Sequence, residues 1–405
     1  MLFWSFVSKA CACSNAALSA VLLAITLATP SLSRAQAPTP DALMDWAEIA
    51  YPSLFPGHQT TTTADGFVYR HYPAANSFLG VKSDGGVYVL FPATDNQIRY
   101  VAAIADFTCL VTPALSACRP PIYTVVFTHI EDNTPLGTLG TTTARTNYLL
   151  WRDRVIQMAQ LARRYNMTWV LQPDWKFLEA ARLYEDTATM ASTGGLNLLR
   201  YVRDTLGTVI DAHSHENGGY NYTDVAYLLD RLGVGGNTVI GGHIWDPTLP
   251  QFAHWERFRV AVAGQRYASF SWRGDILMGS GTPNHTNDPI VSGVWRPQDP
   301  NNYFVDSPSG NIAAVGAYKG DIGGITTLQG LYASGRVPNT CMLTNTVHVN
   351  PASISSTAGL NSVEQDILVP LKALRDSGQV EITDFTNLVA TWKSRFASKG
   401  CLYQE

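Results

Sequence analysis

Four titratable residues stand close together after a short apolar run. Asp211, His213, His215 and Glu216 follow Val209-Ile210, and a Gly-Gly turn and a helical pattern come next. The segment therefore predicts a strand, a loop and a helix, with its chemistry at the carboxyl end of the strand, where sites of α/β proteins lie. Histidines and carboxylates together can hold Zn²⁺, which acidifies a water molecule, while a free carboxylate or imidazole moves protons.

Other predicted strands end in polar residues as well. Glu131 and Asp132 follow the buried run 122–129, and His348 lies in the late run 341–349. Run 237–242 is followed by His243, Trp245 and Asp246, and His285 lies in the loop after run 275–278. We expect these strand ends to meet in one site, in which His243, Trp245, Asp246 and His285 contact the substrate. The sequence has no G-x-S-x-G elbow and no glycine-rich phosphate loop, which weakens serine-hydrolase and nucleotide-binding hypotheses.

The elements that position these residues follow an α/β pattern. From residue 122 strands alternate with helices in about seven β-α repeats, a number and length typical of a (β/α)7–8 barrel. The order of the segments predicts a small α+β accessory domain at 38–108, a Pro- and Cys-rich linker at 109–121 and the barrel at 122–405. Segment 279–335 is rich in Gly, Pro and Asn, so we expect an irregular substrate loop there.

Composition and the N-terminal segment restrict the possible partners. The net charge of −4 offers no basic surface, so nucleic acid is not an expected partner. Residues 1–37 have a basic residue, an apolar run and Ala35-Gln36-Ala37, the pattern of a cleaved signal peptide. The apolar run is too short to predict a membrane span, so no stable membrane insertion is expected. We expect a secreted or periplasmic protein.

Four cysteines remain after the predicted cleavage: Cys109, Cys118, Cys341 and Cys401. An even number in an exported protein suggests disulfides, and four cysteines allow three pairings. Sequence proximity favours Cys109–Cys118, which leaves Cys341–Cys401. A structural zinc site is the alternative, but no C-x-x-C spacing supports it.

Three of these motifs resemble those of the polysaccharide deacetylases, over residues 122 to 396. Glu131-Asp132 stands at the family's acidic pair, His213 begins its H-S/T-x-x-H motif, and Val347-His348 fits its late histidine motif. The resemblance implies that Glu131 is the catalytic base and His348 the acid. It implies Asp132 and His213 as metal ligands, joined by Asn217, which replaces the motif's second histidine, or by His215. The N-terminal segment resembles a small accessory domain of exported bacterial proteins.

The resemblance implies a metal-dependent hydrolase that removes acyl groups from a polysaccharide or cell-wall glycan through metal-activated water, with Zn²⁺ as the expected ion. One alternative is a non-catalytic glycan-binding protein on a degenerate barrel of the same type. Another is a glycosidase that uses a pair of carboxylates such as Glu216 and Asp246. The motifs specify neither the glycan nor the acyl linkage.

Overall fold

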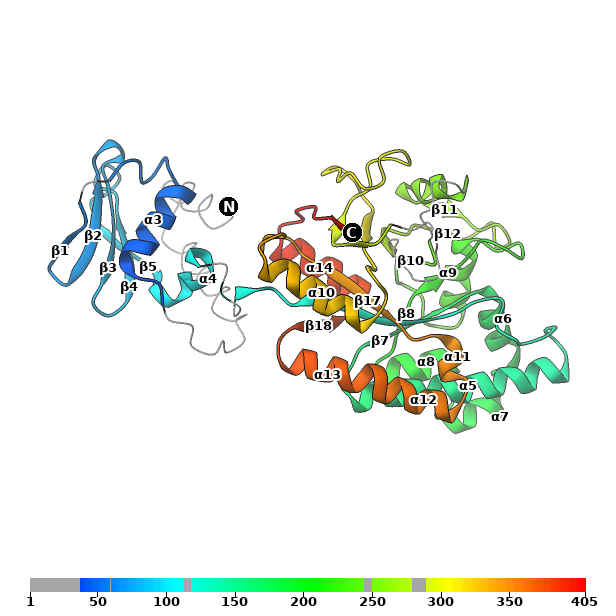
Figure 1. Cartoon of the computed structure of the whole chain (residues 1–405). Helices are drawn as coiled ribbons and strands as arrows, with labels where there is room; N and C mark the ends of the chain where they lie inside the picture. Colours follow the sequence, from blue (N-terminus) through cyan, green and yellow to red (C-terminus); the bar gives the residue numbers. More distant parts are fainter. Residues whose placement is uncertain (1–36, 59, 113–114, 116–117, 244–249, 279–288) are drawn as a thin grey trace. The chain divides into compact units, whose positions relative to one another are not determined.

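The computed structural model describes residues 37–58, 60–112, 115, 118–243, 250–278 and 289–405 (Figure 1). The chain divides into two compact units, one up to Arg119 and one from Pro120 onward. Residues 1–36 of the predicted signal segment lie outside the described residues.

The N-terminal unit is an antiparallel sheet with one helix across a face. Figure 1 shows helix α3 (Pro40–Ala50) lying across the sheet, into which it buries Leu43, Met44 and Ala47. The helix is capped by Thr39, whose Oγ1 accepts a hydrogen bond from the Ala42 N–H at 3.3 Å. The strands pair in chain order: β1 (Thr62–Ala64), β2 (Phe67–Tyr72), β3 (Ser77–Lys82), β4 (Gly86–Leu90) and β5 (Ile98–Ala103). A short helix, α4 (Thr108–Val111), follows.

The C-terminal unit is built on a curled parallel sheet that forms half a barrel. Its central strand β6 (Ile122–Ile130) is buried at every residue, as expected for a parallel strand covered on both faces. The strand order is β17-β6-β7-β8, with β18 paired to the start of β6. The other strands are β7 (Trp169–Pro173), β8 (Val209–Ile210), β17 (Thr344–His348) and β18 (Val380–Thr383).

A second sheet begins where the first one ends. At Asp211 the chain leaves β7, and the next residues, β9 (Ala212–His213), pair with β10 (Val239–Gly241) instead. The strand order of this sheet is β15-β16-β13-β10-β9, and only β15 is antiparallel. The further strands are β13 (Ile276–Met278), β15 (Val294–Trp295) and β16 (Ala313–Val315). The described ladders thus form a mixed α/β fold with a half-barrel, not one continuous (β/α)7–8 barrel, because the third strand divides between two sheets.

Helix α5 (Thr142–Arg164) packs near the segment that joins α12 (Thr357–Ser362) to α13 (Val369–Asp376). At the end of α5, the side chains of Arg164 and Tyr165 each donate a hydrogen bond to Glu364 in that segment. The expectation of an irregular segment at 279–335 is wrong where residues 289–335 form β15, β16 and helix α10 (Ile322–Ala333). The remaining principal helices are α6 (Trp175–Tyr184), α9 (Tyr222–Arg231), α10 (Ile322–Ala333) and α14 (Phe385–Arg395).

Short elements complete this unit. The helical ones are α7 (Thr187–Met190), α8 (Leu198–Arg200) and α11 (Pro351–Ile354), the 3₁₀ segments Ala191–Thr193 and Pro250–Arg259, and the π-helical segments Tyr201–Thr205 and Val363–Leu368. The two-residue strands are β11 (Val262–Ala263), β12 (Ser271–Trp272), β14 (Val291–Ser292) and β19 (Tyr403–Gln404).

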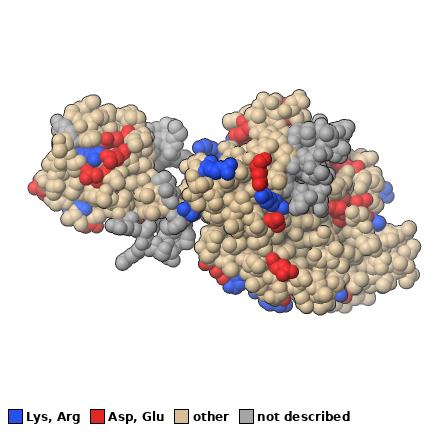
Figure 2. All heavy atoms as spheres, viewed as in Figure 1, with Lys and Arg blue, Asp and Glu red and all other residues tan. Residues whose placement is uncertain are grey.

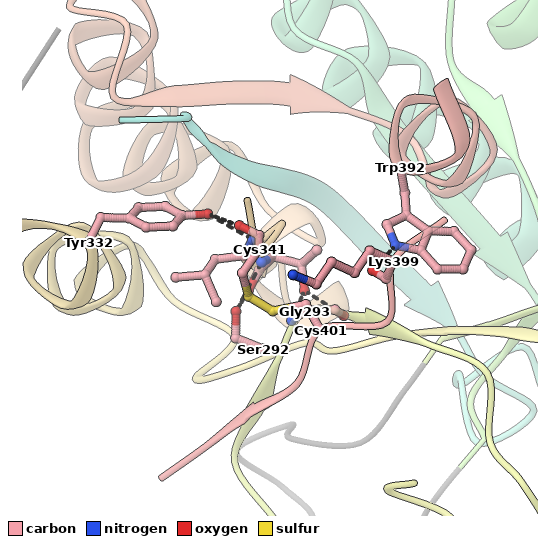
Figure 3. The surroundings of a disulfide bond; sticks show 9 residues. Ser292, Gly293, Tyr332, Cys341, Trp392, Lys399 and Cys401 are labelled. Carbon is pink, nitrogen blue, oxygen red and sulfur yellow. Dashed lines mark hydrogen bonds between the residues drawn. A yellow bond between two sulfur atoms is a disulfide. The ribbon is translucent and has the colours of Figure 1, made fainter. Parts of the chain in front are cut away.

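The cysteines pair as sequence proximity favoured, Cys109 with Cys118 and Cys341 with Cys401. Figure 3 shows the second disulfide beside Tyr332, whose hydroxyl donates to the Cys341 carbonyl at 2.6 Å. On the other side, the Trp392 indole donates to the Lys399 carbonyl at 2.7 Å. The disulfide therefore fastens the end of the chain to the segment that leads into β17.

Charged side chains are sparse on the face of the molecule shown in Figure 2, where basic and acidic residues form small separate groups. None of the described helices has the length and apolar character needed to cross a membrane.

Candidate metal centre

Two strands of the half-barrel sheet and one strand of the second sheet bring histidines or carboxylates together at their carboxyl ends. Strand β6 carries His129 near its carboxyl end and is followed by Glu131, β9 ends at His213, and β17 ends at His348. The register places His348 beside Phe127 of β6. Since parallel strands end at a common edge, residues far apart in the sequence meet there.

His129, Glu131 and His213 form a group that could hold a metal ion. One ligand atom from each lies within 4.8 Å of the others, and the imidazole rings of His129 and His213 are 4.2 Å apart between centroids. The structure thus places His213, expected as a ligand, beside Glu131, expected as the base. His129 was not among the predicted site residues. Its signal in the sequence is its spacing of two from Glu131, at which extended residues point to the same side.

The nitrogen atoms of this group fit a metal. His129 Nε2 and both ring nitrogens of His213 are buried and have no hydrogen-bond partner among the described residues. Burial lowers the pKa of His213 to about 3 and lowers the pKa of His129 as well, so both imidazoles are neutral at physiological pH. A buried polar atom without a partner is costly, and neutral imidazole nitrogens with a carboxylate are ligands that Zn²⁺ prefers.

His215 lies next to the group and pairs with Glu131. Its Nε2 is 3.8 Å from Glu131 Oε1, and its ring centroid is 4.9 Å from that of His213. The neighbouring His215 lowers the pKa of Glu131 to about 2, and Glu131 in turn raises the pKa of His215. Its side chain is 30% exposed, so His215 can exchange protons with solvent.

Asp132 and Asn217, both expected as ligands, are bound to each other outside the group. Asn217 Nδ2 donates to Asp132 Oδ2 at 3.0 Å, and the Trp175 indole N–H donates to Asn217 Oδ1 at 3.0 Å. These hydrogen bonds occupy the Asn217 amide oxygen, the only atom with which an asparagine side chain binds a cation. The structure therefore does not bring Asp132 and Asn217 into the metal-binding group.

His348 stacks on Phe127 at the edge of the group. The two ring centroids are 5.0 Å apart with an 18° angle between the planes, and the His348 ring lies 5.6 Å from that of His129. Burial lowers the pKa of His348, and its Nε2 has no partner among the described residues. Stacking on Phe127 therefore holds the His348 ring in place, while its Nε2 stays available for hydrogen bonding.

Two buried carboxylates support the edge without joining the group. Asp174 caps α6 through the Trp175 N–H, and burial raises its pKa to about 7. Asp211 accepts a hydrogen bond from Asn237 Nδ2 at 2.8 Å, and burial raises its pKa to about 7 as well. Asp211, at the start of the titratable segment, thus joins the two sheets instead of facing the metal group.

Glycine at position 242 makes room for the His213 ring. Gly242 has a φ of +77°, and a Cβ atom there would lie 2.6 Å from His213 Nε2. Real Cβ atoms do not approach other heavy atoms so closely, so any side chain at 242 would displace the ring. The close approach of this backbone fixes where His213 can lie.

The expected substrate residues are only partly described. His243 lines a hollow of about 60 Å³ together with His215, Glu216 and Trp255. Glu216 is paired with Arg257, and this holds one member of the proposed glycosidase pair in an ion pair. Trp245, Asp246 and His285 lie outside the described residues, so their roles stay predictions.

Comparisons with known proteins do not assign this chain to a family. No model of a known protein family matches this sequence, and no protein of curated function matches it.

Proposed function

We propose that this chain is a metal-dependent hydrolase that removes acyl groups from a glycan. The observation that carries the proposal is the group of His129, Glu131 and His213, in which buried imidazole nitrogens without partners among the described residues lie close to a carboxylate, at the carboxyl ends of β6 and β9. The resemblance to polysaccharide deacetylases supplies the reaction class and the glycan substrate.

In this proposal His129, Glu131 and His213 hold the ion, and Zn²⁺ suits their donor atoms. Such an ion acts as a Lewis acid and lowers the pKa of water. The assignment differs from the one that the resemblance implies, because Glu131 becomes a ligand and His129 replaces Asp132. Besides binding the ion, Glu131 orients His215 through its carboxylate.

Two imidazoles beside the group then move the protons. His348, whose pKa is lowered by burial, takes a proton from the attacking water molecule in its neutral form. Water attacks the acyl carbonyl carbon, and the bond from that carbon to the sugar oxygen or nitrogen breaks. His215, whose pKa is raised by Glu131, donates the proton that the leaving alcohol or amine requires, so the proton roles differ from those that the resemblance implies. The products are a carboxylic acid and the free sugar group.

We also propose that the second unit closes as a barrel and that the protein is exported. Backbone bonds support closure: the Thr346 N–H donates to the Ala317 carbonyl at 3.0 Å, and the His348 N–H donates to Gly320 at 3.1 Å. These bonds set β17 against the segment that follows β16. The two disulfides support an oxidising compartment.

A release assay tests the function. The purified protein, loaded with Zn²⁺, is incubated with acetylated xylan, chitin oligosaccharides and 4-nitrophenyl acetate, and acetate is measured. We expect release from at least one substrate, with loss in His213→Ala and after chelation. His58→Ala, a histidine of the N-terminal unit, is the matched control and should be fully active.

Two results would contradict the hydrolase. One is wild-type acetate release by a folded His213→Ala protein. The other is stoichiometric Zn²⁺ uptake without release from any of the three substrates, which would favour the alternative of a non-catalytic glycan-binding protein.

A further inference from the structure

The N-terminal unit has a hollow on the sheet face that α3 does not cover. Side chains alternate along β3 and β4, so Leu79, Val81 and Val87 pack under α3 while Phe78 and Tyr88 point to the opposite face. The hollow measures about 270 Å³. We call it the aromatic hollow, and its principal lining residues are Phe67, Tyr69, Phe78, Gly80, Tyr88 and Ile98.

Gly80 forms the floor of the aromatic hollow. In the register of the sheet it lies between Tyr69 on β2 and Tyr88 on β4. A Cβ atom at this position would lie 2.9 Å from Tyr69 Cβ, so a larger residue would displace the neighbouring tyrosine. The missing side chain leaves space between the aromatic rings.

Aromatic rings form the walls and hold one another. Phe67 and Tyr88 meet edge to face with their centroids 5.3 Å apart, and Tyr88 meets Tyr100 in the same way at 5.4 Å. Tyr69 packs against Phe78 at 6.2 Å. Such contacts fix the orientation of the rings, so the hollow is preformed and its occupant needs to order few side chains.

The polarity of the hollow selects its ligand. Asp65 is the only charged residue among those that line it, which favours an uncharged ligand. Tyr69 and Tyr88 carry hydroxyl groups, which can donate or accept hydrogen bonds. A sugar ring has an apolar C–H face that stacks on aromatic rings and hydroxyl groups at its edge, so it matches both features.

Size and exposure agree with a small ligand. A volume near 270 Å³ is slightly below the ~300–1,000 Å³ of typical ligand pockets and suits one sugar unit. A protein partner would need roughly 800 Å² of surface, which a hollow of this size does not supply. Beside the hollow, Ile98 is 61% exposed and Tyr100 is 51% exposed, and a sugar chain that continues along β5 would cover both.

We propose that the aromatic hollow is a carbohydrate-binding site that takes one uncharged sugar unit of a polysaccharide. The proposal does not depend on the metal centre, because none of its residues belongs to the C-terminal unit. It would allow the N-terminal unit to keep the protein on an insoluble glycan.

Co-sedimentation of the purified full chain with insoluble cellulose, chitin and xylan tests the proposal. The blocking variant is Ile98→Arg, which places a long charged side chain at the rim from a position that is already exposed. Its matched control is Ile49→Arg, on the outer side of α3, where the native side chain is 84% exposed. We expect binding to at least one of the three polysaccharides, weakened about tenfold or more by Ile98→Arg and unchanged by Ile49→Arg.

Folding and activity are checked in the same variants. Thermal unfolding should match the wild type in both, and release of acetate from 4-nitrophenyl acetate should be unchanged, which separates this site from the proposed hydrolase. Tyr100→Ala, a second change at the rim, should also weaken binding. Binding to none of the three polysaccharides overturns the proposal. So does equal binding by wild type and a folded Ile98→Arg protein.

Discussion

Replacing Gly242 with alanine gives a specific test of how the metal group is positioned. The added Cβ would lie 2.6 Å from His213 Nε2, whereas heavy atoms pack at about 3.5–4.0 Å. The His213 ring must therefore move by about 1 Å. Metal–ligand distances tolerate only about ±0.2 Å, so the shift removes His213 from any shared coordination.

We expect Gly242→Ala to weaken Zn²⁺ binding about 10–100-fold, the range found when groups that orient metal ligands are changed. Gly207→Ala is the matched control. Gly207 has a φ of +81°, close to the +77° of Gly242, but no heavy atom lies within 4 Å of an added Cβ. Both variants carry the strain of a left-handed alanine, about 1–2 kcal/mol, and only Gly242→Ala carries the contact with His213.

Zn²⁺ affinity is measured by competition with a chromophoric chelator, and thermal unfolding reports the shared strain. Gly207→Ala should lose stability but bind Zn²⁺ as the wild type does. Equal Zn²⁺ affinities in the two variants would refute the positioning of His213 by the Gly242 backbone.

Three further predictions concern the disulfide, a buried ion pair and the choice of ligands. Cys401→Ser opens a loop of 60 residues and should lower the free energy of unfolding by about 4 kcal/mol in urea titrations; a midpoint equal to that of the wild type would contradict this. Arg152 is buried and bonds Glu185, Ser192 and Thr193, so Arg152→Met should cost about 3–5 kcal/mol. Arg145→Met, which breaks an exposed pair with Asp186, should cost at most about 1 kcal/mol, and similar losses in both variants would argue against a special role for burial. Glu131→Ala should weaken Zn²⁺ binding about tenfold or more, while Asp132→Ala should leave it nearly unchanged; the reverse order would restore Asp132 as the ligand.

Several strands were predicted well from the sequence because they are buried on both faces and therefore consist mostly of apolar residues. The run 122–129 contains mostly apolar residues, and β6 extends it by one residue. The position of His213 at the carboxyl end of a strand was predicted from the short apolar run that precedes it. The sequence did not predict that the third strand divides at Asp211, because this division depends on pairing with two different neighbours.

Two of the longer helices lie where the sequence predicted none, for opposite reasons. Helix α6 carries a readable signal, with Asp174 as N-cap and buried Phe177, Leu178 and Ala181 at helical spacing. Helix α10 contains three glycines, which are poor helix formers, so local propensity argues against it. It forms because Ile325, Leu328 and Leu331 are buried in the core, and this tertiary contribution is absent from the local sequence.

The candidate site was predicted in its location more than in its membership. The predicted strand ends indicated where the titratable groups lie. Four of the predicted residues do come together there: Glu131, His213, His215 and His348. His129 stands at the end of the predicted run 122–129 but was given no role in the site, and Asn217 was chosen by its place in a motif although it bonds Trp175 and Asp132. Which atoms face each other depends on distances between strands, and spacing along the chain does not contain them.

The most direct test of the metal centre is the metal content of the purified protein, measured by elemental mass spectrometry before and after chelation. We expect about one Zn²⁺ or similar divalent ion per chain, removed by the chelator, regained on dialysis against Zn²⁺, and absent from His213→Ala and His129→Ala. A folded wild-type protein that holds no metal and takes none up when offered Zn²⁺ would contradict this expectation.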